Sequence, residues 1–144
     1  MGGAVVAAYT LFESASHNQT KAMIHEEGSF LLAKISWAFS GVQSVVLPSV
    51  GSPGSLLQVT KWNASIGTVS IALSGTDMTI TRGSPAVTET LNNSNVSVSA
   101  LLFTHTYNGG GNPESMDIQF TVSARDARGT IISEDFFSTI YARK

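Results

Sequence analysis

The sequence contains no cysteine among its 144 residues. This absence excludes a disulfide framework, a thiolate metal site and a cysteine nucleophile. Charged residues are also scarce, at 12% of the chain, where soluble domains typically have roughly 25%. The eight basic residues are scattered along the chain, so the sequence lacks the concentrated basic patch that nucleic-acid binding requires.

Long hydrophobic runs and targeting signals are lacking as well. No run of 18 apolar residues occurs, and a transmembrane helix is therefore not expected. The opening stretch MGGAVVAAYTLF is apolar but has no basic region before it, so no signal peptide is evident. We expect the protein in a virion or in the extracellular space, with neither a membrane nor nucleic acid as a partner.

Hydroxyl and amide side chains take the place of the missing charges. The chain has 20 serines, 14 threonines and 7 asparagines, a hydrophobic fraction of 42% and a net charge of −2. This composition is not typical of disorder, which combines few apolar residues with high net charge. It indicates one folded domain with an uncharged, hydroxyl-rich β surface.

Period-two alternation of apolar and polar residues predicts most of the chain to be β-strand. The clearest example covers residues 116–125, and the sequence DARG at 126–129 has the signature of a type I turn. A last strand over 130–141 should then pair antiparallel with 116–125, with an irregularity or an end near Glu134 and Asp135. The other predicted strands are 30–39, 42–47, 56–62, 67–73, 78–81, 86–91 and 96–107.

These elements predict an all-β fold: a single-domain antiparallel β-sandwich, jelly-roll-like, with about eight to nine strands. Residues 1–28 form an N-terminal arm, or a strand plus a short helix over 18–28 that Gly28 would end. Residues 29–144 form the sandwich domain. The apolar front of the arm needs a surface to lie on, and a neighbouring subunit can provide one.

The chain carries no recognisable catalytic motif. Its least ordinary stretch, HTYNGGGNPES at 105–115, lacks the lysine and the following helix that a phosphate loop needs. The three histidines, His17, His25 and His105, do not have zinc-ligand spacing. No Gly-x-Ser-x-Gly elbow is present either. We therefore predict no catalytic residues, no bound metal and no cofactor.

Two exposed segments are the candidates for contact with a partner or a ligand. We predict that the glycine-rich loop joins two antiparallel strands and touches a partner through its tip, because loops at the ends of sandwiches often bind. Trp62 is the best candidate platform for a sugar ring, although we expect both Trp62 and Trp37 in the core. The candidate contact residues are Trp62, Asn63, Tyr107, Asn108, Gly109, Gly110, Gly111 and Asn112.

Composition and pattern favour a non-enzymatic structural protein of a virus or bacteriophage particle. The specific expectation is a capsid decoration (cement) protein, or another exterior virion component, that acts by burying surface in an oligomer. Its partners would be further copies of itself, for example in a trimer, and a capsid. The alternative is a carbohydrate-binding or adhesin-type β-sandwich module. An enzyme is the third class and a soluble pore-forming protein a fourth.

Overall fold

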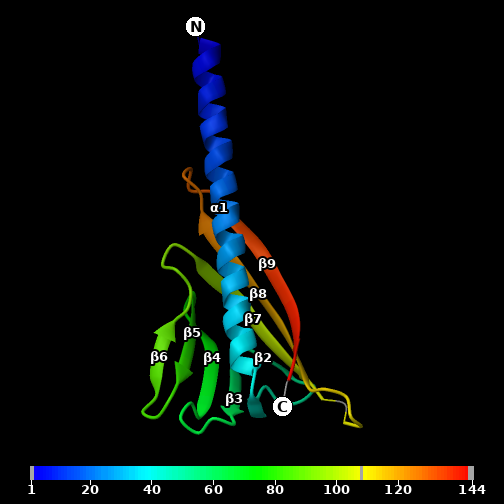
Figure 1. The fold of residues 1–144 in the computed structure, drawn as a ribbon. Coiled ribbons are helices and arrows are strands. Elements are labelled where there is room, and N and C mark those ends of the chain that lie inside the picture. The colour runs from blue at the N-terminus through cyan, green and yellow to red at the C-terminus, as the bar shows by residue number, and fades with distance from the viewer. Residues whose placement is uncertain (1, 108, 143–144) are drawn as a thin grey trace.

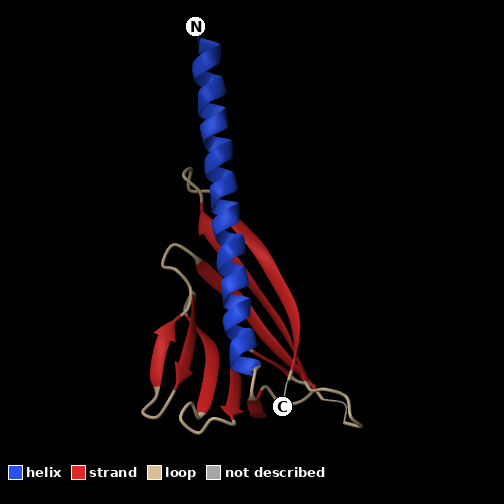
Figure 2. Ribbon diagram, viewed as in Figure 1, coloured by secondary structure: helices blue, strands red, loops and turns tan. Residues whose placement is uncertain are grey.

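A computed structural model describes residues 2–107 and 109–142. Within these residues the chain forms one long helix followed by nine strands in two antiparallel sheets (Figures 1 and 2). This architecture confirms the prediction of an all-β antiparallel sandwich, and its N-terminal element is one long helix where an arm or a short helix was expected. The elements are α1 (Gly2–Phe39), β1 (Val42–Leu47), β2 (Pro53–Gly54), β3 (Leu57–Lys61), β4 (Thr68–Ser74), β5 (Asp77–Arg82), β6 (Val87–Thr90), β7 (Ser97–Thr106), β8 (Ser115–Arg125) and β9 (Ile131–Tyr141).

The two sheets contain five and four strands. The larger has the order β1-β3-β4-β5-β6 and the smaller the order β2-β7-β8-β9, so most neighbours in a sheet are also neighbours in the chain. The turn between β8 and β9 closes with a hydrogen bond from the Gly129 amide to the Asp126 carbonyl at 3.0 Å, as its sequence predicts. Strand β8 pairs with β9 without a register shift, so the irregularity expected near Glu134 and Asp135 is wrong.

The predicted strand over residues 30–39 is wrong, because these residues form the last part of α1. Leu31, Ile35 and Ala38 are buried, and their spacing of four and three is that of one helix face. Leu31 and Ile35 also satisfy an alternating pattern, which is why the sequence is ambiguous here. Trp37 lies off the buried face with 39% of its surface exposed, so its expected place in the core is also wrong.

Helix α1 is continuous across residue 28, where we expected the N-terminal arm to end. Gly28 is buried in the helix because the Phe136 ring of β9 occupies the space that a Cβ would need. The helix ends instead at Phe39, followed by Gly41 with a φ of 61°. Glycine is favoured after a helix C-terminus because it adopts this left-handed conformation without steric cost.

The core forms where the inner face of α1 meets the inner faces of both sheets. In Figure 1, α1 runs along the sheets, with β4–β6 on one side and β9 on the other, while β7 and β8 pass behind the helix. The Phe120 and Phe136 rings stack with centroids 5.4 Å apart. The largest fully buried side chains come from α1 and from six strands: Ile24, Leu31, Ile35, Phe39, Val42, Leu57, Ile71, Met78, Phe103, Met116, Ile118 and Phe120.

Strand β7 contains a bulge that changes which of its side chains are buried. The register with β8 shifts between Ser99 and Leu102, and Ala100 has a φ of 53°. Leu101 and Phe103 are therefore buried while Leu102 is exposed. The alternation of buried and exposed side chains along β7 therefore moves by one residue at the bulge.

Candidate functional site

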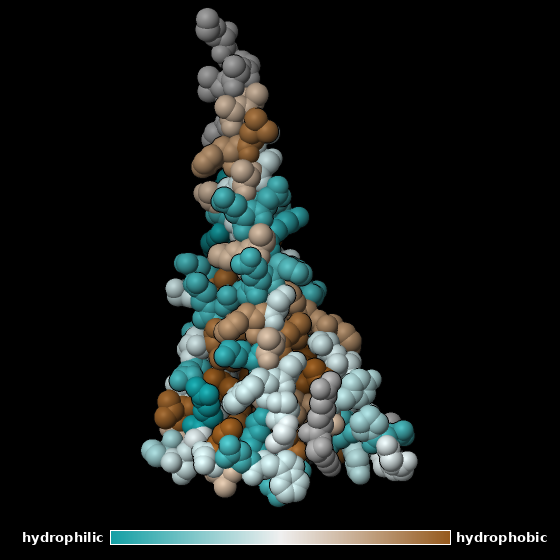
Figure 3. Space-filling view, viewed as in Figure 1, coloured by the Kyte–Doolittle hydropathy of each residue, from teal (hydrophilic) through white to brown (hydrophobic). Residues whose placement is uncertain are grey.

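The N-terminal part of α1 projects beyond the β domain (Figure 1). We call residues 2–12 the α1 tip. Its sequence, GGAVVAAYTLF, contains no charged residue. Leu11 and Phe12 are exposed over 71% and 67% of their surface, and Figure 3 shows hydrophobic residues on the projecting helix. These two neighbouring side chains form an exposed apolar patch on an uncharged segment, and contiguous apolar patches mark surfaces that partners cover.

The turn between β8 and β9 holds α1 just below this tip. The Arg128 guanidinium lies 2.8 Å from a Glu13 carboxylate oxygen, and the Ala127 amide donates to the Ser16 hydroxyl at 3.2 Å. His17 Nδ1 lies 3.7 Å from an Asp126 carboxylate oxygen. These contacts fix the direction in which the tip leaves the domain and neutralise the Glu13 charge beside it.

Asp126 is the centre of this turn. Its carboxylate accepts hydrogen bonds from the Arg128 and Thr130 amides at 2.9 and 3.0 Å. Burial by itself would raise the pKa of the carboxyl. The two amides, the Arg128 charge and the bond to His17 outweigh burial and hold the Asp126 pKa below its usual value.

The candidate sugar platform is an exposed side chain. Trp62 follows β3 and exposes 63% of its surface, so the expectation that it lies in the core is wrong. The side-chain oxygen of Asn63 accepts a hydrogen bond from the Ser65 amide at 3.0 Å, and its carbonyl accepts from the Ile66 and Gly67 amides. Asn63 therefore shapes the β3–β4 turn, and Trp62 is presented beside that turn.

The glycine-rich segment connects two antiparallel strands, β7 and β8, as predicted. Gly109, Gly110 and Gly111 have φ values of 64°, 63° and 87°, which other residues adopt only with strain. Tyr107 is half exposed and the Asn112 amide donates to the Gly109 carbonyl at 3.2 Å. Asn108 lies outside the described residues.

The structure does not unite these candidate residues into one site. Trp62 and Asn63 belong to the connection after β3, whereas Tyr107 and residues 109–112 belong to a separate loop after β7 (Figure 1). Among the hydrogen bonds of the described residues, none joins the two segments. They remain two independent candidate contact points.

A cluster around Trp37 was missed by the sequence patterns. Lys61 Nζ lies 4.8 Å from the Trp37 ring centroid and the Arg82 guanidinium carbon 5.9 Å from it. The Lys61 ammonium also donates to the Trp37 and Ser40 carbonyl oxygens, and burial lowers the pKa of Lys61. These residues are far apart in the chain, so only the tertiary fold could reveal the cluster.

Histidine and carboxylate side chains form pairs, and no metal-binding cluster, in the part of the chain that the structure describes. No group of three or more histidine, aspartate or glutamate residues there is placed to hold a metal ion. His105 is buried against Glu114 at 2.6 Å and His25 contacts Glu134 at 3.0 Å, so each of these two histidines pairs with one carboxylate.

Comparisons with known proteins identify no relative. No protein-family model matches the chain, and no curated protein or solved structure matches it either. Across residues 2–107 and 109–142, no helix has both the length and the apolar character needed to cross a membrane.

Proposed function

We propose that the protein is a non-enzymatic structural subunit of a larger protein assembly and that the α1 tip attaches it to its neighbours. The observation that carries this proposal is the exposure of Leu11 and Phe12 on a helix that extends beyond its own domain. Burial of each of these side chains would stabilise an interface by about 1.5–3 kcal/mol. Water is therefore an unfavourable environment for the tip, and a partner surface a favourable one.

The charge distribution along the helix supports the same proposal. Glu13 is the only charged residue from Gly2 to Thr20, and Arg128 of the same chain already pairs with it. An interface formed by the tip would consequently bury no unpaired charge, which would otherwise cost several kcal/mol. A helix surface of this composition suits contact with other protein.

A capsid decoration protein, or another exterior component of a virus particle, is the specific form of this proposal. In that arrangement the tip would contact the capsid or further copies of the chain, for example in a trimer. The β domain would face solvent with its serine- and threonine-rich surface. The scarcity of charge fits a protein that acts by surface burial, because so few titratable residues leave little material for catalysis.

Light scattering of the full chain at increasing concentration tests the attachment. We expect the wild-type protein to form an oligomer and the double variant Leu11→Gln, Phe12→Gln to be monomeric with an unchanged circular dichroism spectrum. Phe137→Gln is the matched control, since Phe137 is exposed over 68% of its surface on β9, away from the tip. It should associate like the wild type.

Particles purified from the native source then test whether the assembly is a virus particle. Electron microscopy with an antibody against the β domain should place the protein on the exterior of a particle. A wild-type chain that stays monomeric at every concentration and is absent from all particles would overturn the proposal.

A carbohydrate-binding module is the second candidate, because Trp62 is exposed next to a turn rather than buried. Its indole face is free to stack on the C–H groups of a sugar. A glycan array probed with the wild type and with Trp62→Ala separates the two functions. Glycan binding that is lost in Trp62→Ala would favour the carbohydrate-binding module. An array without any signal would favour the structural subunit.

A further inference from the structure

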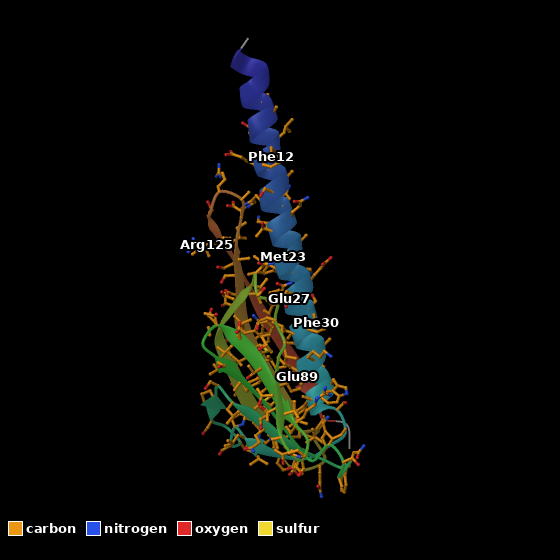
Figure 4. All side chains as sticks on the ribbon, turned by 90° about the vertical axis from the view of Figure 1, so that its left-hand side faces the viewer. Phe12, Met23, Glu27, Phe30, Glu89 and Arg125 are labelled. Atoms are coloured by element: carbon orange, nitrogen blue, oxygen red, sulfur yellow. The ribbon has the colours of Figure 1, made fainter. Side chains whose placement is uncertain are left out.

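Two adjoining hollows lie between the outer flank of α1 and the β5–β6 hairpin. The first, of about 400 Å³, is lined by Phe30, Ala33, Lys34, Trp37, Ile80, Arg82, Glu89 and Leu91. The second, of about 370 Å³, shares Trp37, Arg82 and Glu89 with the first and continues to Val87. We call the two together the Trp37 groove. In Figure 4, Phe30 and Glu89 lie on the same face of the molecule, with β6 toward the viewer.

The walls of the groove combine apolar side chains with positive charge. Phe30 and Trp37 of α1 are partly exposed, as is Val87 of β6. Lys34 Nζ lies 5.3 Å from the Phe30 ring centroid. This lining would match a side chain that has an apolar body and a polar end. It would equally match two neighbouring side chains, one apolar and one polar.

Cations outnumber carboxylates around Trp37. Lys34 and Arg82 line the groove, and Glu89 is the only carboxylate among the lining residues. Arg82 and the buried Lys61 lie against the Trp37 ring. Arg82 and Glu89 pair at 3.2 Å, with both side chains about half exposed. Lys34 adds a positive charge at the mouth of the groove. The groove is therefore positive, although the chain as a whole has a net charge of −2.

Strand β6 forms the open side of the groove. It is the last strand of the five-stranded sheet and all four of its residues are exposed. Among the described strands, only β5 pairs with it. An unpaired sheet edge offers backbone N–H and C=O groups to an extended segment, and such a segment gains specificity from pockets for alternate side chains.

We propose that the Trp37 groove binds an extended segment of a partner protein in which an acidic side chain neighbours an apolar one. The segment lies along the free edge of β6. Its apolar side chain packs between Phe30 and Leu91, and its carboxylate faces Lys34 and Arg82. Charge complementarity selects this occupant over a neutral or basic strand, because a basic strand would bring its charge against these cations. The groove and the α1 tip are separate surfaces, so this binding does not depend on the proposed attachment through the tip.

The small number of tryptophans allows binding in the groove to be followed by fluorescence. The chain has two tryptophans, so the variant Trp62→Phe leaves Trp37 as the single reporter inside the groove. The probe is a library of random twelve-residue peptides displayed on phage and selected against the full chain. Each enriched peptide is then synthesised and titrated into Trp62→Phe while the Trp37 emission is followed.

We expect enriched peptides to carry aspartate or glutamate beside an apolar residue and to shift the Trp37 emission to shorter wavelength. Replacing their carboxylates by amides should weaken binding by about tenfold, and raising the salt concentration should weaken it further. In the reciprocal variant Trp37→Phe, the emission of Trp62 should not change.

Two charge reversals on the same helix provide the matched comparison. Lys34→Glu should reduce peptide affinity about tenfold or more, while Lys21→Glu, at an exposed position outside the groove, should leave it unchanged. The proposal is overturned if nothing is enriched, if enriched peptides lack acidic residues, or if both reversals weaken binding equally.

Discussion

His105 of β7 lies with its Nε2 atom 2.6 Å from a carboxylate oxygen of Glu114, at the base of the glycine-rich loop. The other ring nitrogen of His105 lies 3.1 Å from the Pro48 carbonyl oxygen. The imidazole of β7 thus joins the residue that precedes β8 to the loop that follows β1. Because His105 is buried, both contacts are shielded from water and hold the segment in place.

Glu114→Ala should lower the free energy of unfolding by about 1–3 kcal/mol, because it leaves a buried imidazole nitrogen without this partner. Urea denaturation followed by circular dichroism measures the loss. Glu89→Ala is the control, since its pair with Arg82 is exposed and contributes about 0–1 kcal/mol. Equal losses of unfolding free energy in the two variants would mean that the buried His105–Glu114 pair contributes no more than the exposed pair.

Shortening Gly109–Gly111 to one glycine should leave the fold intact. The loop lies beyond the last β7–β8 pair, Thr106 with Ser115, and a change of two residues alters the closure entropy by less than about 1 kcal/mol. The urea midpoint checks stability, and binding to particles from the native source checks function. If the loop tip contacts a partner, binding to the particles will weaken while the urea midpoint stays the same.

Asp126→Asn should destabilise the protein near neutral pH and have a decreasing effect as the pH falls. The folded-state pKa of Asp126 is lowered, so its carboxylate stabilises the fold at pH values above the unfolded-state pKa of about 3.9. That contribution is lost as the pH falls through the lower folded-state value.

Urea midpoints of the wild type and Asp126→Asn, compared from neutral to acidic pH, should therefore converge. Glu26→Gln serves as the control at an exposed position of α1. A difference between the wild type and Asp126→Asn that grows toward low pH would contradict this assignment.

Gly28→Ala should lower the melting temperature although alanine is the better helix former. The intrinsic gain is about 1 kcal/mol, but the new Cβ would overlap the buried Phe136 ring, and overpacking of this kind costs about 1–3 kcal/mol. The neighbouring change Ser29→Ala, at an exposed position, should be neutral or stabilising. Combining Gly28→Ala with Phe136→Leu should recover part of the loss.

Thr121→Asp should destabilise the β8–β9 pair. Thr121 lies directly opposite Asp135 and donates a hydrogen bond to its carboxylate at 2.6 Å. A second carboxylate there would remove this bond and add repulsion, at a cost of about 0.2–1 kcal/mol, which added salt should reduce. Thr121→Asn, which places an uncharged side chain at the same position, is the control that should lack the salt dependence.

Much of the β domain was predictable because its strands show the local period of a half-buried sheet. Residues 116–125 alternate between buried and partly or fully exposed positions as the sequence indicates, and DARG at 126–129 forms the expected turn. Both features depend on neighbouring residues only: the side-chain period of a strand and the backbone preferences of aspartate and glycine.

The helix and the Trp37 groove could not be predicted from the sequence, because both depend on contacts between residues that are distant in the chain. Leu31 and Ile35 fit a strand and a helix equally well, and burial of one helix face against two sheets selected the helix. Gly28 is a helix-stop signal on local grounds, yet the Phe136 ring of β9 packs against it within α1. Local periodicity thus set the strands and turns, while packing between distant elements decided the length of α1, the exposure of both tryptophans and the cations gathered around Trp37.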